Sequence, residues 1–174
     1  CGRPFSAPCS WARVSAEAVG FTLGPRLNAA GRIAEASEAL DLLLTRDADK
    51  ANSIASEISA KNSERQRMQK AIAAEALAAV PQQCREDDRV LVVGGEGWHP
   101  GVVGIVAAKL VDTFWRPAVV LCRSNGEWHG SGRSIPGFDL GRAIEALGSD
   151  IVNGGGHAMA AGLACLYSAI ARKW

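Results

Sequence analysis

One glycine-rich stretch of this sequence, residues 130–134, carries side chains that suit a phosphate group. Ser131 and Arg133 are two positions apart, so on a β-strand they would point to the same face. A guanidinium binds phosphate oxygens through charge-assisted hydrogen bonds, each contributing about 1.5–3 kcal/mol. Ser134 adds a second hydroxyl to the set. We expect a phosphate site here, although a polar edge strand softened by glycine would leave the same pattern.

A second stretch, residues 154–162, begins with three glycines that are followed at once by His157. Glycine loses the most backbone entropy on ordering, so three in succession favour a sharp turn or a ligand lying close to bare N–H groups. Gly155 and Gly156 are the candidates for that approach. A core histidine bonded to the backbone is the alternative for His157, but it requires no glycines beside it. We expect both stretches to meet at one phosphate-bearing substrate.

A third polar stretch, residues 24–32, places Arg26, Asn28 and Arg32 between glycines. We expect its Gly-Pro start to end a short helix, leaving a charged turn that faces a cleft and suits a polyanion. An exposed arginine rim without a ligand is the alternative.

Two further histidines lie near these stretches. His99 begins a His-Pro-Gly turn and is expected to line the same cleft, together with Ser134. His129 would share a strand face with Ser131 and Arg133, and we favour a structural role for it.

No residue pattern in the sequence predicts a metal site or a nucleophile. Asp47 and Asp49 form an Asp-x-Asp pair, but they open a helix, where acidic residues cap the chain and interact favourably with the helix dipole. No other His, Cys, Asp or Glu group has ligand spacing, and no Ser-His-Asp or Cys-His order is recognisable. The residues alone predict a binding site without a catalytic centre, and no metal or cofactor held by this chain.

Composition describes an ordinary globular protein. Hydrophobic residues make up 48% and charged residues 21% of the 174, and the net charge of +1 excludes a strongly basic nucleic-acid binder. Five scattered cysteines favour reduced thiols and a cytoplasmic location, and no stretch predicts a membrane span or signal peptide. Because the chain starts with Cys1, we expect a fragment.

Periodicity predicts an α/β chain with a long helix in the middle. Residues 47–80 lack internal Pro and Gly and are polar all round over residues 61–67, which is typical of a helix bridging two lobes, with Pro81 ending it. A helix over residues 35–44 should bury Ala39, Leu40, Leu43 and Leu44. The remaining expected elements are a short helix up to Phe21, strands over 90–93, 117–122, 128–134 and 158–166, and helices over 102–114 and 138–147.

Four stretches together resemble the later motifs of the RecJ family, the single-strand-specific 5′→3′ exonucleases of the DHH phosphoesterase superfamily. They match in order and approximate spacing over residues 14–166, and they are residues 21–32, 98–104, 130–134 and 154–162. The resemblance implies a helical remnant of the DHH domain (13–45), a connecting helix (46–80) and a DHH-associated substrate-binding domain with a small mixed sheet (81–166). Residues 1–12 and 167–174 would be a leader and a tail outside the family pattern.

The family resemblance also implies a chemistry. Its members hydrolyse single-stranded DNA from the 5′ end in DNA repair and recombination, with two Mn²⁺ or Mg²⁺ ions held by an Asp-His-His segment that this sequence lacks. We therefore expect the chain alone to be inactive. By resemblance, Ser131 and Arg133 match the 5′-phosphate pocket, assisted by Arg26 or Arg32, and His157 faces the scissile phosphate and stabilises its charge.

The partners implied by the resemblance are single-stranded DNA with a 5′ end and a single-strand-binding protein or a helicase; no membrane is expected. Self-association through the leucines of residues 35–44 is a further hypothesis. Two alternatives stay open: a phosphodiesterase of the same superfamily acting on oligonucleotides or cyclic dinucleotides, and a non-catalytic nucleic-acid-binding or scaffold module.

Overall fold

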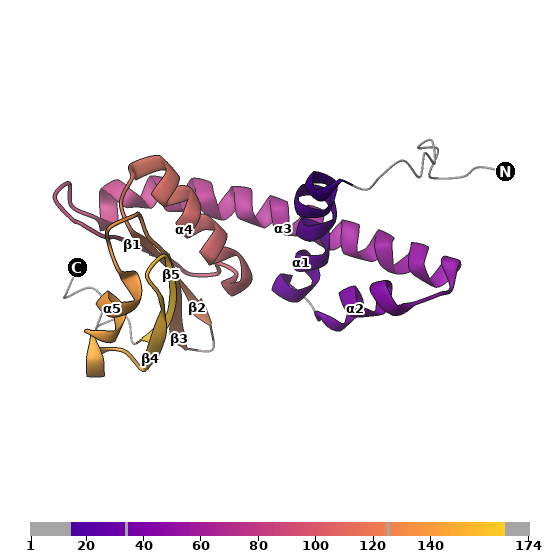
Figure 1. Ribbon diagram of the computed structural model, residues 1–174. Coiled ribbons are helices and arrows are strands. Elements are labelled where there is room, and N and C mark those ends of the chain that lie inside the picture. The colour runs from indigo at the N-terminus through magenta and orange to yellow at the C-terminus, as the bar shows by residue number, and fades with distance from the viewer. Residues whose placement is uncertain (1–14, 34, 125, 166–174) are drawn as a thin grey trace. The chain divides into compact units, whose positions relative to one another are not determined.

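The computed structural model describes residues 15–33, 35–124 and 126–165 of the chain (Figure 1). They form two compact units that divide after Ser63, within the long helix α3 (Ala48–Gln83). The predicted connecting helix thus contributes to both units. The predicted leader, residues 1–12, and tail, residues 167–174, lie outside the described residues.

In the first unit, helical structure continues through Gly24 and Pro25, where the sequence predicted a stop. A π-helical segment, η1 (Ala18–Leu23), leads directly into α1 (Gly24–Ile33). The N–H of Gly24 donates to the carbonyl of Val19, five residues back. Pro25, which has no N–H, then occupies the start of the next helix, where proline is tolerated. The polar stretch over residues 24–32 is therefore helical, and the predicted turn is wrong.

Helix α2 (Ser37–Leu44) confirms the second predicted helix, but its predicted burial is wrong. Leu40, Leu43 and Leu44 are 55%, 68% and 68% exposed, and no residue of this fully described helix is buried. Glu38, on another side of α2, forms an ion pair with Lys61 of α3. The spacing of the leucines identified an apolar face, but spacing cannot tell whether another element covers that face.

The long helix α3 is polar, but its middle is less exposed than the sequence predicted. Asn62, within the stretch predicted to be polar all round, retains only 7% exposure. The helix also continues two residues past Pro81. Among the described residues, no helix is both long enough and apolar enough to span a membrane.

In the second unit, the described strands form one mixed sheet, which confirms the predicted α/β class. Its order is β1-β2-β3-β5-β4, with β1 and β2 parallel and the other pairs antiparallel. The strands are β1 (Leu91–Gly95), β2 (Ala118–Ser124), β3 (Glu127–Arg133), β4 (Asn153–His157) and β5 (Ala160–Cys165). The other helices of this unit are α4 (Pro100–Phe114), α5 (Leu140–Glu145), which Asp139 caps as predicted, and the 3₁₀ turn η2 (Gly148–Asp150).

Each face of the sheet has its own apolar core. The C-terminal part of α3 and helix α4 cover one face, where Val106 and Leu110 pack with Val120. Helix α5 covers the other face, where Ile144 packs with Leu163. Figure 1 shows α4 and α5 on opposite sides of the strands. Because side chains alternate along a strand, residues of the same strand belong to different cores.

The outer edge of β1 is covered by a side chain from the end of α3. The carboxamide of Gln83 accepts a hydrogen bond from the N–H of Gly94 (2.8 Å) and donates to the carbonyl of Gly94 (3.1 Å). These are the two bonds that another strand would make. The edge is thus protected against pairing with other chains at this point.

Candidate functional site

Arg133 and His157 lie on the same face of the sheet, on either side of β5. In the register of the antiparallel strands, Arg133 of β3 and His157 of β4 both lie directly opposite Ala160 of β5. Residues directly opposite each other in antiparallel strands point to the same face. Two strand spacings separate the outer members of the row, or about 10 Å between backbones.

A second row, adjacent to the first, is almost free of side chains. Ser131 of β3 lies opposite Gly162 of β5, which lies opposite Gly155 of β4. The two rows together place Ser131 and Arg133 on one flank of a bare backbone floor and His157 on the other. We call this surface, made of Ser131, Arg133, Gly155, Gly162 and His157, the site face.

The guanidinium of Arg133 is held beside the hydroxyl of Ser131. Its Nη1 donates to the carbonyl of Gly132 (2.7 Å) and to Oγ of Ser131 (3.3 Å), and both side chains are half-buried. The two side chains therefore reach one place on the sheet, as strand alternation requires.

The triple glycine forms strand β4, so of the two alternatives that the sequence left open the sharp turn is not found there. Packing explains two of the three glycines. A Cβ on Gly154 would lie 2.7 Å from Cδ1 of Ile151, and one on Gly156 would lie 2.5 Å from the carbonyl oxygen of Ala160. A Cβ on Gly155 would have no atom within 4 Å. By strand alternation, Gly154 and Gly156 face the α5 side, and Gly155 alone faces the site.

His99 and Ser134, predicted to line the cleft, have structural tasks. Nδ1 of His99 accepts a hydrogen bond from the N–H of Gly101 and so caps the start of α4. Ser134 is 5% exposed, and its hydroxyl donates to the carbonyl of Phe138 (2.8 Å). These bonds account for both residues without a ligand.

The polar residues of α1 do not gather on one side of that helix. None of the three residues Arg26, Asn28 and Arg32 is buried. A rotation of 100° per residue puts Asn28 and Arg32 on neighbouring positions and Arg26 on nearly the opposite side. Nη1 of Arg26 donates to the carbonyl of Thr22 (2.6 Å), which draws the guanidinium back along the helix. The structure therefore does not join the three residues into one site within their unit.

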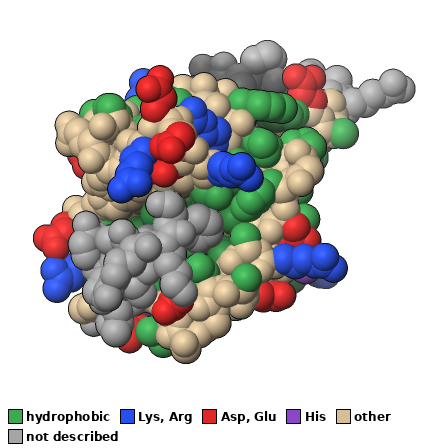
Figure 2. Space-filling view, turned by 90° about the vertical axis from the view of Figure 1, so that its left-hand side faces the viewer, with side chains coloured by type: hydrophobic (Ala, Val, Ile, Leu, Met, Phe, Trp, Pro, Cys, Tyr) green, Lys and Arg blue, Asp and Glu red, His purple; other side chains and the backbone are tan. Residues whose placement is uncertain are grey.

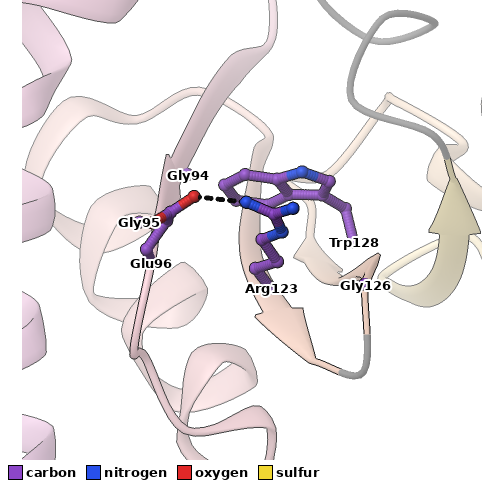
Figure 3. A pocket seen from close by; sticks show the side chains of 6 residues that line it. All are labelled: Gly94, Gly95, Glu96, Arg123, Gly126 and Trp128. Carbon is purple, nitrogen blue, oxygen red and sulfur yellow. Dashed lines mark hydrogen bonds and ion pairs between the residues drawn. The ribbon is translucent and has the colours of Figure 1, made fainter.

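A separate hollow of about 550 Å³ lies at the far end of β1 and β2, and the sequence did not predict it. Figure 3 shows the ion pair between Arg123 and Glu96 (2.7 Å) in front of the indole of Trp128. Arg123 lies opposite Trp128, whose side chain alternates with that of Ser131, so the hollow is on the α5 side of the sheet. Three glycines complete its lining. No local motif could have revealed it, because its residues come from separate strands and loops.

The charges and thiols of the described residues set limits on the chemistry. No group of three or more His, Cys, Asp or Glu in the described ranges is arranged to hold a metal ion. Burial raises the pKa of Cys165 to about 11, and it also raises the pKa of Cys122, so these thiols stay protonated at neutral pH. On the side of the molecule seen in Figure 2, Lys and Arg side chains are interspersed with acidic ones, in keeping with the net charge of +1.

The sequence of this chain is similar to those of known proteins. Residues 87–166, which contain the whole sheet, match the model of the DHHA1 domain. The RecJ single-stranded-DNA-specific exonuclease of Bacillus subtilis is 48% identical over 149 residues, covering 84% of this chain and 19% of that protein. RecJ of Escherichia coli is 38% identical over 159 residues, covering 87% of the chain and 28% of the relative. The chain thus spans less than a third of either relative.

Solved structures agree with the sequence relatives. The crystal structure of RecJ with Mg²⁺ from Thermus thermophilus superposes with a TM-score of 0.77 at 31% identity, over 87% of this chain and 23% of that one. A structure of exonuclease RecJ bound to manganese gives a TM-score of 0.76 at 32% identity, over 88% and 38% of the two chains. The likeness confirms the long helix followed by a mixed sheet.

Proposed function

We propose a substrate-binding function for this chain, which belongs to the RecJ family of single-stranded-DNA-specific exonucleases and contains its DHHA1 domain. The site face binds the 5′ end of a DNA strand. Arg133 and Ser131 hold the terminal phosphate, because the guanidinium supplies a full charge and paired donors while the hydroxyl supplies a third. The backbone of the strand then crosses the bare floor toward His157.

One observation carries this proposal: the pair formed by Gly155 and Gly162. Both residues are on the site face, and a Cβ on Gly155 would meet nothing, while one on Gly162 would meet only the carbonyl oxygen of Gly130 at 3.7 Å. The fold itself therefore does not need glycine at either position. A ligand that approaches the backbone closely does need it. Phosphate oxygens beside exposed peptide groups are such a ligand.

His157 lies on the flank opposite Arg133 and is exposed. In our proposal its imidazole faces a second phosphate of the bound strand and stabilises negative charge there, instead of acting as a base. Arg26 and Arg32 belong to the other unit. We propose that one of them assists in contacting the DNA backbone, and that Asn28 does so too.

Metal ions do not enter these steps. Two related RecJ structures contain Mg²⁺ or Mn²⁺, and such ions supply an activated water and neutralise phosphate charge when bound. The described residues of this chain do not fit them. We therefore propose that the chain binds and orients the strand without cutting it. Nucleotide release from single-stranded DNA by the purified 174-residue protein in Mn²⁺ would contradict this.

The phosphate contact can be tested with two arginines of the same sheet. A single-stranded oligonucleotide with a 3′ fluorophore is titrated with either a 5′-phosphate or a 5′-hydroxyl, and anisotropy is measured. Arg133→Ala should reduce the preference for the phosphate about tenfold, because a charge-assisted contact is lost. Arg123→Ala removes an equal charge from the opposite face and should change nothing. Equal effects of both variants, or none from Arg133→Ala, would reject the phosphate site.

A further inference from the structure

We infer that Gly104 of α4 is a positioning residue that fixes the Ser131 and Arg133 side chains in the geometry needed for phosphate. This inference rests on the proposed function. It concerns a residue that needs no contact with DNA.

Glycine at this position is unexpected from helix formation alone. Gly104 is the fifth residue of the 15-residue helix α4, and it is buried. Glycine in a helix interior is less favourable than any residue except proline. Its neighbours on the buried side of α4 are valines and an alanine, which a helix packed on a sheet normally carries. A specific contact must therefore explain the missing side chain.

That contact is with the phosphate-binding pair. A Cβ on residue 104 would lie 2.7 Å from Oγ of Ser131 and 3.2 Å from Nη2 of Arg133. The first distance is too short for any real contact, so the hydroxyl would have to rotate away. Rotation separates Oγ from Nη1 of Arg133, which now lies 3.3 Å from it. A methyl group at position 104 would thus disturb both phosphate ligands together.

The helix is held too firmly to move aside instead. Val102, Val103 and Val106 on either side of Gly104 are 0–2% exposed. Just before α4, Nε1 of Trp98 donates to a carboxylate oxygen of Glu75 on α3 (2.7 Å). Moving α4 outward would open the core of this face, while turning one hydroxyl costs much less. The added methyl therefore displaces the ligands of the site face.

The test uses Gly104→Ala with the two oligonucleotides described above. We expect the preference for a 5′-phosphate to fall about tenfold, while affinity for the 5′-hydroxyl strand stays within about twofold. Val103→Ala is the matched control, because it weakens the buried packing of the adjacent position of α4. It should lower the melting temperature and leave the phosphate preference intact. If Val103→Ala also loses the phosphate preference, any loss of packing in α4 has this effect, and the specific role of Gly104 is rejected.

A double variant keeps the test decisive if Gly104→Ala folds poorly. Ser131→Ala removes the atom at 2.7 Å and leaves Nη2 of Arg133, at 3.2 Å, as the nearest atom to the added methyl. That nitrogen is the end of a flexible side chain and needs to shift by only a few tenths of an ångström. In that background Gly104→Ala should change the phosphate preference by about threefold or less. A full further loss of about tenfold would overturn the inference. If Arg133→Ala has no effect on the phosphate preference, the proposed function is rejected. If Arg133→Ala abolishes the preference and Gly104→Ala does not, only the positioning role of Gly104 is rejected.

Discussion

Arg133 and His157 face each other across Ala160, so one residue of β5 is the cross-strand neighbour of both. Their side chains start from the same face and the same end of the sheet. The chain separates them by 24 positions, and α5 and η2 lie between. The antiparallel pairing of β3 and β4 with β5 therefore brings together two stretches, residues 130–134 and 154–157, that are not in contact along the chain. It turns a serine–arginine pair and a glycine-histidine run into one surface.

Gly155→Ala should separate binding from stability. Gly155 has no positive φ and open space at Cβ, so alanine should leave the free energy of unfolding unchanged or raise it by about 0.4–1 kcal/mol through the unfolded chain. The same methyl occupies the floor of the site face and should weaken binding of single-stranded DNA several-fold. Urea unfolding and anisotropy titration measure the two effects.

The neighbouring Gly156→Ala is its control and should behave in the opposite way. A Cβ there meets backbone atoms at 2.5 Å, so we expect a loss of about 1–3 kcal/mol of stability. If Gly155→Ala binds DNA as tightly as the natural chain, the bare floor has no role in recognition.

Much of the fold was predictable because its elements have strong local signals. The apolar run before Gly94, the Pro-Gly start of α4 and the Asp139 cap each act within a few residues, and each predicted element formed. The continuation of helix through Gly24 and Pro25 was missed because it follows a π-helical segment, which ends in a hydrogen bond that spans five residues. Local preference rules treat a Gly-Pro pair as a stop.

The residues of the candidate site could be predicted from the sequence, but the pairing of the strands that carry them could not. Alternation placed Ser131 and Arg133 on one face, but the register that adds His157 is set by long-range contacts. The triple glycine was compatible with a turn in the sequence. Composition cannot distinguish a glycine that packing requires, such as Gly154, from one with free space at its Cβ position, such as Gly155. Only neighbouring atoms distinguish the two.

Binding of single-stranded DNA should depend on salt modestly. The net charge is +1, so only local cations such as Arg133 contribute. Two or three phosphate contacts would give a slope of log K against log salt of about −1.4 to −2.1. Affinity should then fall about 7- to 20-fold between roughly 50 and 200 mM NaCl. Arg133→Ala should make the slope about 0.7 less negative, and an unchanged slope would show that Arg133 meets no phosphate.

Stability should decline at alkaline pH because of buried thiols. The pKa of Cys165 is raised to about 11 by burial, above the value of the unfolded chain. Between about pH 9 and 11 the unfolded chain loses this proton while the folded chain keeps it, so rising pH favours unfolding, by about 1–2 kcal/mol at pH 10. Cys165→Ala removes this contribution. At neutral pH the urea midpoint of this variant should be lower than that of the natural chain, because the substitution leaves a cavity. Between neutral pH and about pH 10, however, its midpoint should fall by less than that of the natural chain. Parallel curves would contradict the assignment.

The exposed leucines of α2 should cause self-association at high protein concentration. Leu40, Leu43 and Leu44 form an apolar surface at 55–68% exposure, and burying such side chains against a second copy is favourable at about 25 cal/mol per Å². Light scattering should show an apparent mass that rises with concentration toward twice that of the 18.2 kDa chain. Leu43→Glu should keep the chain monomeric, because association would then bury an unpaired carboxylate. Ser56→Glu adds the same charge to an exposed position of α3, outside the three leucines, and should associate like the natural chain. A monomer at every concentration would show that this surface does not bind a second copy.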